Sequence, residues 1–342
     1  MDSKRVIVTG GCGYLGSHTI IELLQNGFEV VSIDNFSRSL PIALENIYRV
    51  TGIRVKNFSI DLCSQKAVDT VFTELDDASA LIHFAAFKSV PESVLYPEIY
   101  YRNNLVSLVN VLEAGGKIGI NKFVFSSSCS VYGQIGELPV SETTPLSNVK
   151  SPYAHSKAMG EVIVGDMCRA YQMSAVLLRY FNPVGAHTSG LIGEMPRGHS
   201  DNLVPVITQT AIGKRDSMIV YGGELNTRDG SCIRDYVHVM DIACAHVLAL
   251  KYLQRNKDLV EIINLGTGRG ITVFEMIRTF EEVTRLKLEY RVGEPREGDV
   301  DAIYSSSEKA LRLLGWEPRY SIQEMMASAW QWEMELKKNS YL

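Results

Sequence analysis

Four glycines lie in the stretch VTGGCGYLGSH, which runs from Val8 to His18 near the start of the chain. An apolar run precedes these glycines and a helical pattern follows them. Glycine loses more backbone freedom on folding than any other residue, so a helix that begins in this way is weakened unless something compensates. A strand that passes through a glycine-rich turn into a helix lets backbone N–H groups approach a phosphate at the positive end of the helix dipole. We therefore predict that a bound pyrophosphate provides the compensation.

The spacing of the glycines fits two versions of a dinucleotide-binding motif. Gly11, Gly13 and Gly16 match G-x-G-x-x-G, whereas Gly10, Gly13 and Gly16 match G-x-x-G-x-x-G, so the role of each glycine stays open. Asp34 ends the next apolar run, roughly 20 residues on, where an acid binds the adenosine ribose hydroxyls. An acid there also repels a 2′-phosphate and so favours NAD over NADP, although the nearby Arg38 keeps NADP open. The alternative interpretation is a tight turn beside a surface aspartate.

Short β-rich runs alternate with helix-length stretches through the first half of the chain. The runs are Arg5 to Val8, Val30 to Ile33, Val55 to Ile60, Ala80 to His83, Phe123 to Ser127 and Ala175 to Arg179, and the helical stretches include Leu15 to Asn26, Lys66 to Leu75 and Tyr101 to Ala114. Such alternation predicts strands joined by right-handed crossovers. The fold class is therefore α/β, a doubly wound parallel sheet of the Rossmann type.

The alternation weakens after Phe181, and proline and glycine interrupt residues 183–198. We place a domain boundary here, with residues 1–182 as the dinucleotide-binding domain and residues 183–342 as a smaller, mixed α/β substrate-binding domain. A strand pattern returns at Ile262 to Gly266, and a helical pattern follows from Val273 to Thr284. The chain is therefore expected to cross between the domains again near residues 235–270.

Composition and charge restrict the partners. The 342 residues are 46% hydrophobic and 21% charged, as in an ordinary globular protein. The formal net charge of −5 offers no general attraction to nucleic acid or to anionic lipid, so we expect a small-molecule substrate and neither of those partners. No apolar run approaches the roughly 20 residues of a membrane span, and Met1 to Lys4 lead into a strand pattern without a signal peptide. We expect a cytoplasmic protein.

The cysteines and histidines give no sign of a metal site. The six cysteines form no C-x-x-C pair, which fits buried thiols in a reducing compartment better than a disulfide framework. The seven histidines show no ligand spacing. We therefore expect no bound metal.

A second constellation is Tyr153-Ala-His-Ser-Lys157, which follows Ser151-Pro152. If a helix begins here, Tyr153 and Lys157 lie one turn apart on the same face and can reach one point. A free tyrosine has a pKa near ~10, but a neighbouring ammonium and a bound nicotinamide cation would each favour the phenolate and make Tyr153 a proton acceptor. Upstream, an apolar run ends in hydroxyls, of which Ser128 is our choice as the third polar group, with Ser126, Ser127 and Ser130 as alternatives.

These residues belong to a longer set of motifs. The set comprises GGCGYLGSH (10–18), Asp34-Asn35, HFAAFKSVPES (83–93), YYRNN (100–104), FSSSCSVYG (125–133), SPYAHSK (151–157), LRYFNPVGAH (178–187), Asn202-Leu203, IRDYVHVMD (233–241), NLGTG (264–268) and REGD (296–299). Together they resemble the UDP-glucose 4-epimerase family, a branch of the extended short-chain dehydrogenases/reductases. The resemblance covers nearly the whole chain.

The resemblance implies interconversion of UDP-galactose and UDP-glucose with tightly bound NAD⁺. Tyr153 would take the proton of the sugar 4-hydroxyl while C4 gives up hydride, Lys157 would hold the nicotinamide ribose and lower the pKa of the tyrosine, and Ser128 would orient the hydroxyl. The 4-keto intermediate would then rotate and take the hydride back on its other face. UDP must therefore supply most of the binding energy while the hexose stays loosely held.

By the same resemblance, two further sets of residues would contact the ligands. NAD would be bound by Gly10, Gly13, Tyr14, Leu15, Gly16, Asp34, Asn35, Asp61, Leu62, Phe84, Ala85, Lys88, Asn103, Ser126, Tyr153, Lys157 and Tyr180. The UDP-hexose would be bound by Lys88, Ser128, Tyr153, Phe181, Asn182, Asn202, Leu203, Tyr221, Arg234, Arg296, Asp299 and Ile303. Relatives commonly form dimers through helices next to the Tyr/Lys helix, so a homodimer is expected.

Several alternatives remain beside this interpretation. A sugar-nucleotide dehydratase or decarboxylase also oxidises C4, but Ser128 is followed by Cys129 and Ser130, without the carboxylate that elimination requires. An epimerase of another UDP-sugar (N-acetylhexosamine, uronic acid or pentose) stays open. In the family, the residue at position 303 borders the C2 substituent of the sugar, and Ile303 is bulkier than the small residue that admits N-acetyl groups. A non-catalytic NAD-binding regulator is the alternative from another class.

Overall fold

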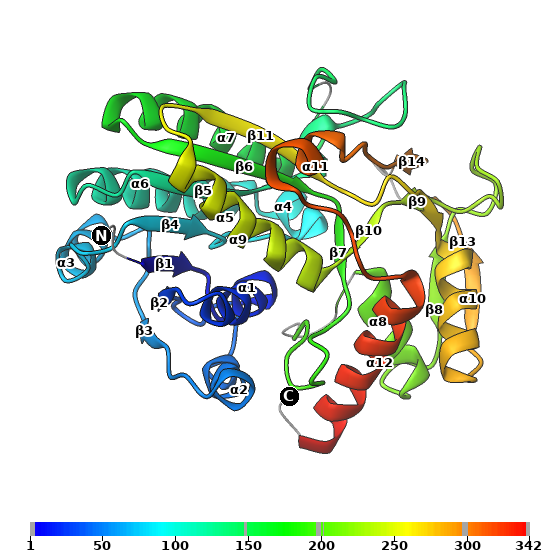
Figure 1. Ribbon diagram of the computed structural model, residues 1–342. Coiled ribbons are helices and arrows are strands. Elements are labelled where there is room, and N and C mark those ends of the chain that lie inside the picture. Colours follow the sequence, from blue (N-terminus) through cyan, green and yellow to red (C-terminus); the bar gives the residue numbers. More distant parts are fainter. Residues whose placement is uncertain (1–3, 147–148, 196–199, 201, 296–299, 340–342) are drawn as a thin grey trace.

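A parallel sheet of seven strands forms the centre of the computed structural model, which describes residues 4–146, 149–195, 200, 202–295 and 300–339 (Figure 1). The strand order is β11-β6-β5-β4-β1-β2-β3. The bounds are β1 Arg5–Thr9, β2 Glu29–Ile33, β3 Lys56–Phe58, β4 Ala80–His83, β5 Lys122–Ser128, β6 Ser174–Tyr180 and β11 Val260–Leu265. The predicted doubly wound α/β sheet is confirmed.

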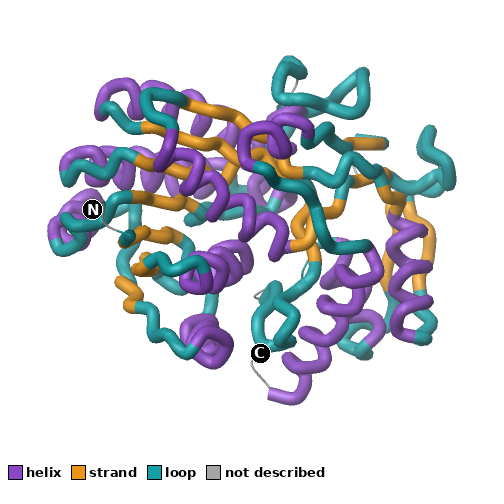
Figure 2. The backbone as a smooth tube through the Cα atoms, viewed as in Figure 1, coloured by secondary structure: helices purple, strands orange, loops and turns teal. Residues whose placement is uncertain are grey.

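Helices cover both faces of this sheet (Figure 2). One layer contains α1 (Tyr14–Gln25), α2 (Ile42–Thr51) and α9 (Val239–Arg255), and the other contains α3 (Gln65–Thr73), α6 (Ser107–Lys117) and α7 (Pro152–Tyr171). Alternate strand residues enter two separate apolar cores, with Val124 in one and Phe123 and Phe125 in the other. The strands therefore read as almost continuous apolar runs, because neither face meets water.

The predicted helix from Tyr101 to Ala114 is not one regular helix. A short α4 (Val90–Leu95) and α5 (Pro97–Tyr101) lead into a π-helical turn, η1 (Arg102–Val106), and α6 begins only at Ser107. The side chain of Asn104 in this turn accepts a hydrogen bond from Phe87 N at 2.8 Å and donates to Ser156 Oγ at 3.0 Å. The widened turn thus turns a polar side chain inward to tie the β4–α4 loop to α7.

The second half of the chain adds small sheets beside the main one. The 3₁₀ turn η2 (Cys129–Tyr132) follows β5, and the later elements are β7 (Asn182–Val184), α8 (Leu203–Ala211), β8 (Met218–Tyr221), β9 (Ile233–Arg234), β10 (Tyr236–His238), β12 (Ile271–Thr272), α10 (Val273–Thr284), β13 (Tyr290–Gly293), β14 (Ala302–Ile303), α11 (Glu308–Leu314) and α12 (Ile322–Asn339). A third core fills the space among α8, α10 and α12. After β10, the chain returns through α9 to β11 at the edge of the main sheet. The division at residue 182 into two domains remains a prediction.

None of the helices in the described ranges combines the length and apolarity that crossing a membrane would require.

Candidate active site

The four glycines of the turn between β1 and α1 differ in how closely other protein atoms surround them. Gly10 has φ +68°, a left-handed conformation, and a Cβ there would lie 2.8 Å from Ala85 N. A Cβ on Gly11 would lie 2.4 Å from Ser32 Oγ, and one on Gly16 would lie 2.1 Å from Gly10 O. These three glycines are therefore required by the fold of the turn itself.

Gly13 differs, because only one protein atom lies close to the position of its Cβ. It is the N-cap of α1 with φ −75°, which any residue can adopt, and a Cβ at this position would meet only Gly10 O, at 3.3 Å. No side chain caps this helix, and its first turn holds no acidic residue. The N–H groups of Tyr14, Leu15 and Gly16 precede the first bond of the helix, Ser17 N to Gly13 O. The turn therefore fits an anionic group placed against Gly13.

Asp34 follows β2 and is fixed against this turn. Its Oδ2 accepts a hydrogen bond from Cys12 N at 3.0 Å, and its Oδ1 accepts from Phe36 N at 2.9 Å and Ser39 Oγ at 2.7 Å. Arg38 pairs with Glu92 at 2.7 Å and lies over the ring of Phe87. Because of Arg38, the sequence leaves binding of NADP, with its 2′-phosphate, as an alternative. In the structure this guanidinium is paired with the carboxylate of Glu92.

The remaining residues predicted to bind NAD lie beyond the carboxyl ends of neighbouring strands, where α/β sheets bind ligands. Phe84 and Ala85 directly follow β4, and Asp61 and Leu62 follow β3. Asp61 Oδ1 accepts from Cys63 N at 2.9 Å, while Leu62 is buried. The set is completed by Asn35, which is exposed, and by Asn103, which lies in the π-helical turn and donates to Asn104 Oδ1 at 3.0 Å.

The predicted Tyr/Lys helix forms, and it starts where the sequence indicates. Ser151 is the N-cap of α7 and its Oγ accepts from Ala154 N at 3.2 Å, while Pro152 takes the first helical position. Lys157 is 4% exposed, and its Nζ donates to Ser126 O at 2.6 Å. The side chain of Ser128, the last residue of β5, lowers the pKa of Tyr153 through hydrogen bonding. The structure thus brings Tyr153, Lys157 and Ser128 to the carboxyl end of one strand.

The electrostatics of Tyr153 differ from the expectation for the chain on its own. Burial raises the pKa of Tyr153 to about 12, and the hydrogen bond with Ser128 lowers it only in part. Burial also lowers the pKa of Lys157 to about 8, against the opposing charge of Glu161. The ammonium of Lys157 is bonded to the Ser126 carbonyl. In this chain, Lys157 by itself therefore does not stabilise the phenolate of Tyr153.

The other serines of this strand end have different partners. Ser126 Oγ is hydrogen-bonded to Tyr180 OH, and Ser127 Oγ donates to Glu161 Oε1 at 2.6 Å. Ser128 Oγ accepts from Ser130 N at 3.2 Å as well as contacting Tyr153. Of the serines weighed from the sequence, Ser128 is the one whose hydrogen bonding lowers the pKa of Tyr153.

Several residues predicted to bind the UDP-hexose lie on paired strands. The register places Ile303 directly opposite Arg234, between β14 and β9, and Asn182 opposite Tyr236, between β7 and β10. Ile303 and Phe181 are buried, and Arg234 Nη1 donates to Val300 O at 2.7 Å. Tyr221 lies at the exposed end of β8. Arg296 and Asp299 lie outside the described residues.

Sequence reasoning missed Glu194, which joins two predicted ligand residues. Its Oε1 accepts from Lys88 Nζ at 2.6 Å and from Asn202 Nδ2 at 2.9 Å. Its backbone carbonyl accepts from Trp332 Nε1 at 2.8 Å, which fixes the segment. Leu203 follows Asn202 as the first residue of α8, and Tyr14 donates to Gly185 O at 2.6 Å. No single-sequence signal marks Glu194, because its role depends on contacts that are distant along the chain.

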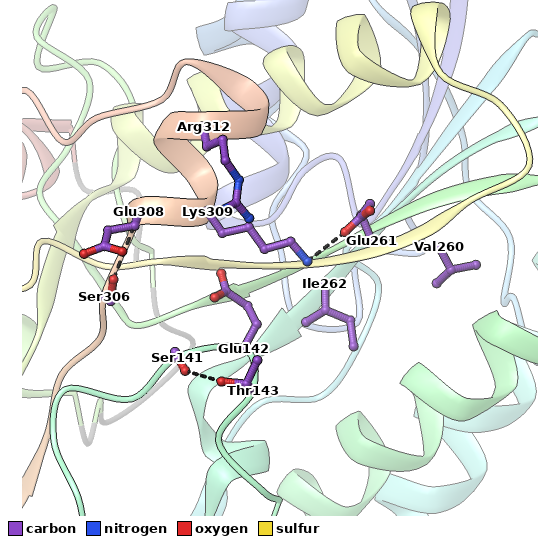
Figure 3. A pocket seen from close by; sticks show the side chains of 10 residues that line it. All are labelled: Ser141, Glu142, Thr143, Val260, Glu261, Ile262, Ser306, Glu308, Lys309 and Arg312. Atoms are coloured by element: carbon purple, nitrogen blue, oxygen red, sulfur yellow. Dashed lines mark hydrogen bonds and ion pairs between the residues drawn. The ribbon is translucent and has the colours of Figure 1, made fainter.

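One cavity lies away from the predicted site residues. It has a volume of about 500 Å³ and is lined by the loop at Ser141–Thr143, the edge strand β11 and α11 (Figure 3). Two of the lining residues form an ion pair, with Lys309 Nζ 2.7 Å from Glu261 Oε2 (Figure 3). None of the predicted site residues lines this cavity. Among the described residues, no three His, Cys, Asp or Glu side chains gather as a metal ion would require.

Comparison with known proteins places this geometry among sugar-nucleotide enzymes. The family model described as GDP-mannose 4,6 dehydratase matches residues 7–329. UDP-glucose 4-epimerase of Bacillus subtilis (strain 168) is 44% identical over 329 residues, which cover 96% of each chain. The structure of UDP-glucose 4-epimerase from Bifidobacterium longum with NAD⁺ and UDP matches with a TM-score of 0.93 and 41% identity, covering 98% of this chain and 99% of that one. The Stenotrophomonas maltophila enzyme with NAD and formylated UDP-arabinopyranose matches with a TM-score of 0.94 and 38% identity, with coverage of 98% and 99%.

Proposed function

The chain belongs to the UDP-glucose 4-epimerase family, and we propose on that premise that it interconverts UDP-galactose and UDP-glucose as an NAD-dependent isomerase. The observation that carries the proposal is the meeting of Tyr153, Lys157 and Ser128 at the end of β5, on the same edge of the sheet as the glycine turn. Identity of 40–44% over almost the full chain, shared with epimerases from several organisms, supports it.

Each group in this constellation has a chemical task. NAD⁺, held by the glycine turn, Asp34 and Lys157, would supply the hydride acceptor for C4 of the hexose. Ser128 orients the 4-hydroxyl through its hydroxyl group, and Tyr153 accepts the proton of that hydroxyl. When the 4-keto sugar has turned over, Tyr153 returns the proton, and C4 is inverted without net oxidation.

Tyr153 can act as this base only when positive charge reaches it. With a pKa of about 12, its hydroxyl holds the proton firmly in the buried site. Lys157 lies one helical turn further on, with its ammonium 2.6 Å from the Ser126 carbonyl. When NAD⁺ is bound, Lys157 would hold the nicotinamide ribose, and the nicotinamide would add a positive charge of its own. Both effects favour the phenolate.

Residues of the second half of the chain would bind the UDP portion of the substrate. We assign the diphosphate and uridine to Asn182, Asn202, Leu203, Tyr221, Arg234, Arg296 and Asp299, because arginine makes two-pronged contacts with phosphate and the asparagines offer amide donors. Lys88 then contacts ligand oxygens from the first half. A tight grip at this end leaves the hexose able to rotate, which inversion requires.

Dehydration, the activity in the name of the family model, does not fit the strand end. Elimination of water needs an acid near the serine that orients the substrate. Here Cys129 and Ser130 follow Ser128, and burial raises the pKa of the Cys129 thiol to about 12. A thiol of this kind gives up its proton poorly, so the reaction stops at oxidation and return.

The test is to mix the purified protein with UDP-galactose, without added cofactor, and to measure UDP-glucose. We expect turnover in the parent protein and a loss of about 10²- to 10⁴-fold in kcat for Tyr153→Phe, the range typical of a lost general base. Binding of NAD and UDP should be nearly unchanged, because only one hydroxyl is removed. Full activity of Tyr153→Phe would reject the assignment.

We also infer that two copies of the chain form a homodimer through the layer around α7. The side chains of Val90, Val94, Leu95, Tyr96, Ile99, Val106, Met159 and Val162 are all exposed. They lie on α4, α5, η1 and α7 or between them, and these elements pack against one another. An apolar face of this size on adjacent helices is typical of an interface between subunits.

The oligomeric state can be tested by light scattering after gel filtration. We expect a dimer for the parent protein and a monomer for the double variant Val94→Glu/Val162→Glu. Val292→Glu, which changes an exposed valine on β13, is the matched control and should remain dimeric. A monomeric parent protein would contradict the inference.

A further inference from the structure

A buried network of polar side chains lies beside the reacting groups and takes no part in the mechanism above. Arg179 Nε donates to Glu161 Oε1 at 2.8 Å, and Arg179 Nη2 donates to Glu161 Oε2 at 2.5 Å. Ser127 Oγ donates to the same carboxylate at 2.6 Å. Arg179 Nη1 donates to Tyr132 OH at 3.1 Å, and Tyr132 OH donates to Asn264 Oδ1 at 2.7 Å.

All five side chains are buried, with Glu161 the most exposed at 8%. A buried ion pair is stabilising only when further hydrogen bonds satisfy its charges, and here both carboxylate oxygens and all three nitrogens of the guanidinium have partners. Well-packed apolar residues could hold the same elements together without the cost of desolvating two charges. The charges therefore suggest a role beyond holding α7 on the sheet.

The network ends at the catalytic constellation from two directions. Glu161 lies four residues after Lys157 on α7, so the two side chains share one face of the helix. Ser127 lies between Ser126, whose carbonyl accepts from Lys157, and Ser128, which contacts Tyr153. The Glu161 carboxylate thus binds Ser127, in the middle of the strand end, and lies one helical turn from the ammonium of Lys157.

Among the charged and titratable groups around Lys157, Glu161 carries the negative charge that acts on it. His83 on β4 feels the ammonium, which adds to burial in lowering the pKa of this histidine to about 3, so it is neutral. Tyr153 on the same helix and Tyr180 on β6 both hold their protons, because burial raises the pKa of each. Glu161 opposes the burial that lowers the pKa of Lys157. Arg179, also on β6, is paired with that carboxylate.

We propose that Glu161, oriented by Arg179, is a positioning residue of the reaction: it keeps Lys157 as an ammonium and holds the Ser126–Ser128 strand end in register with α7. The proposal rests on the proposed function, in which Lys157 must be positively charged to favour the phenolate of Tyr153. Arg179 acts on Glu161 alone, by fixing where the carboxylate stands.

The experiment replaces the charge of Glu161 and follows the proton of Lys157 directly. In protein labelled with ¹³C at lysine Cε, the signal of Lys157 is identified by its absence from Lys157→Arg, and its shift is recorded against pH. We expect its titration to move to lower pH by about one unit in Glu161→Gln, since an opposite charge one turn away is lost. The alkaline limb of kcat against pH should move in the same direction, while KM for UDP-galactose stays within about twofold because the UDP grip lies elsewhere.

Two further variants separate this effect from a loss of folding. Removal of one partner of a buried ion pair is strongly destabilising, so Glu161→Gln is paired with the double variant Glu161→Gln/Arg179→Met, which leaves no buried charge unpaired. The double variant should fold and keep the shifted titration. Glu333→Gln is the matched control, because Glu333 is a residue of α12 that is 4% exposed and pairs with Lys214 at 2.9 Å. Its melting temperature should fall while the titration of Lys157 stays as in the parent.

A titration of Lys157 that is unchanged in the folded double variant overturns the proposal and leaves the network a purely structural one. Failure of the proposed function gives a different result, since the parent protein itself would then produce no UDP-glucose from UDP-galactose. The NMR titration needs no turnover and decides between the two.

Discussion

The contrast between Gly13 and Gly16 allows the packing role of a glycine to be separated from its role toward a ligand. Both belong to either version of the motif, and both lie at the start of α1. We compare Gly13→Ala with Gly16→Ala, which add the same methyl group three residues apart. Only Gly16 is crowded by the protein itself.

The structure sets the size of each effect. A Cβ on Gly16 would lie 2.1 Å from Gly10 O and 2.8 Å from Gly11 Cα, so the backbone of the turn must move by about 1 Å. Such overpacking costs about 1–3 kcal/mol or more, offset by about 1 kcal/mol because alanine is the better helix former. A Cβ on Gly13 meets only Gly10 O, at 3.3 Å, so its cost is that of alanine at an N-cap, about 0.5–1 kcal/mol.

Two assays should therefore separate the effect of each variant on stability from its effect on NAD binding. Thermal unfolding is measured on NAD-free protein, because a bound ligand itself raises the melting temperature. Gly16→Ala should melt up to about 3 °C lower than the parent, and Gly13→Ala about 1 °C lower. The NAD content of the purified protein, measured after acid release, should fall in both variants. In Gly13→Ala the dissociation constant for NAD should rise at least ~10-fold without a comparable loss of stability. Parent-like NAD content in Gly13→Ala would refute the reasoning.

Three further predictions follow from single side chains. Glu194→Gln weakens the competition for Lys88 and Asn202, so UDP should bind about 3- to 10-fold more tightly by calorimetry, in line with the roughly 1 kcal/mol of a partly exposed ion pair; an unchanged affinity would exclude that competition. Ile303→Ala should raise the turnover of UDP-N-acetylgalactosamine relative to UDP-galactose, and an unchanged ratio would show that Ile303 does not border C2 of the sugar. Burial raises the pKa of Asp241 to about 6, so the folded state holds this proton more tightly than the unfolded state. The stability from that proton is complete below pH ~3.8 and is lost as pH rises through 6, by up to about 3 kcal/mol; Asp241→Asn should therefore gain melting temperature over the parent at pH 7.5 but not at pH 4, and an equal difference at both pH values would contradict this.

The parts of the fold that the sequence predicts are those governed by local pattern. The strand Ala80–His83 and the helix Val273–Thr284 have the bounds expected from their apolar spacing. The π-helical turn at Arg102–Val106 does not follow from spacing, because it results from Asn104 reaching Phe87 and Ser156 in other elements. Helix α2 is not predicted from the sequence either, because only Asn46 and Ile47 of its residues are buried and its apolar face is narrow.

The candidate site divides in the same way. The positions of Tyr153, Lys157 and Ser128 follow from one helix start and one strand end, so a single sequence predicts that they meet. The assignment of their ligands remains a prediction. Glu194 and Glu161 could not be found from spacing, because each acquires its role from partners on other elements, 8 to 106 positions away for Glu194 and 18 to 34 for Glu161.

The raised pKa of Tyr153 has a consequence for the order of events in the site. At pH 7, a group with a pKa of about 12 is ionised in roughly one molecule in 10⁵. On the assignment proposed above, the chain by itself therefore holds Tyr153 protonated, and the positive charge of a bound cofactor would be needed to ionise it. On the same assignment, burial of Tyr153 would make proton transfer to it depend on a bound cofactor. A sugar that reached Tyr153 before the cofactor was bound would meet a neutral phenol, and its hydroxyl would keep its proton.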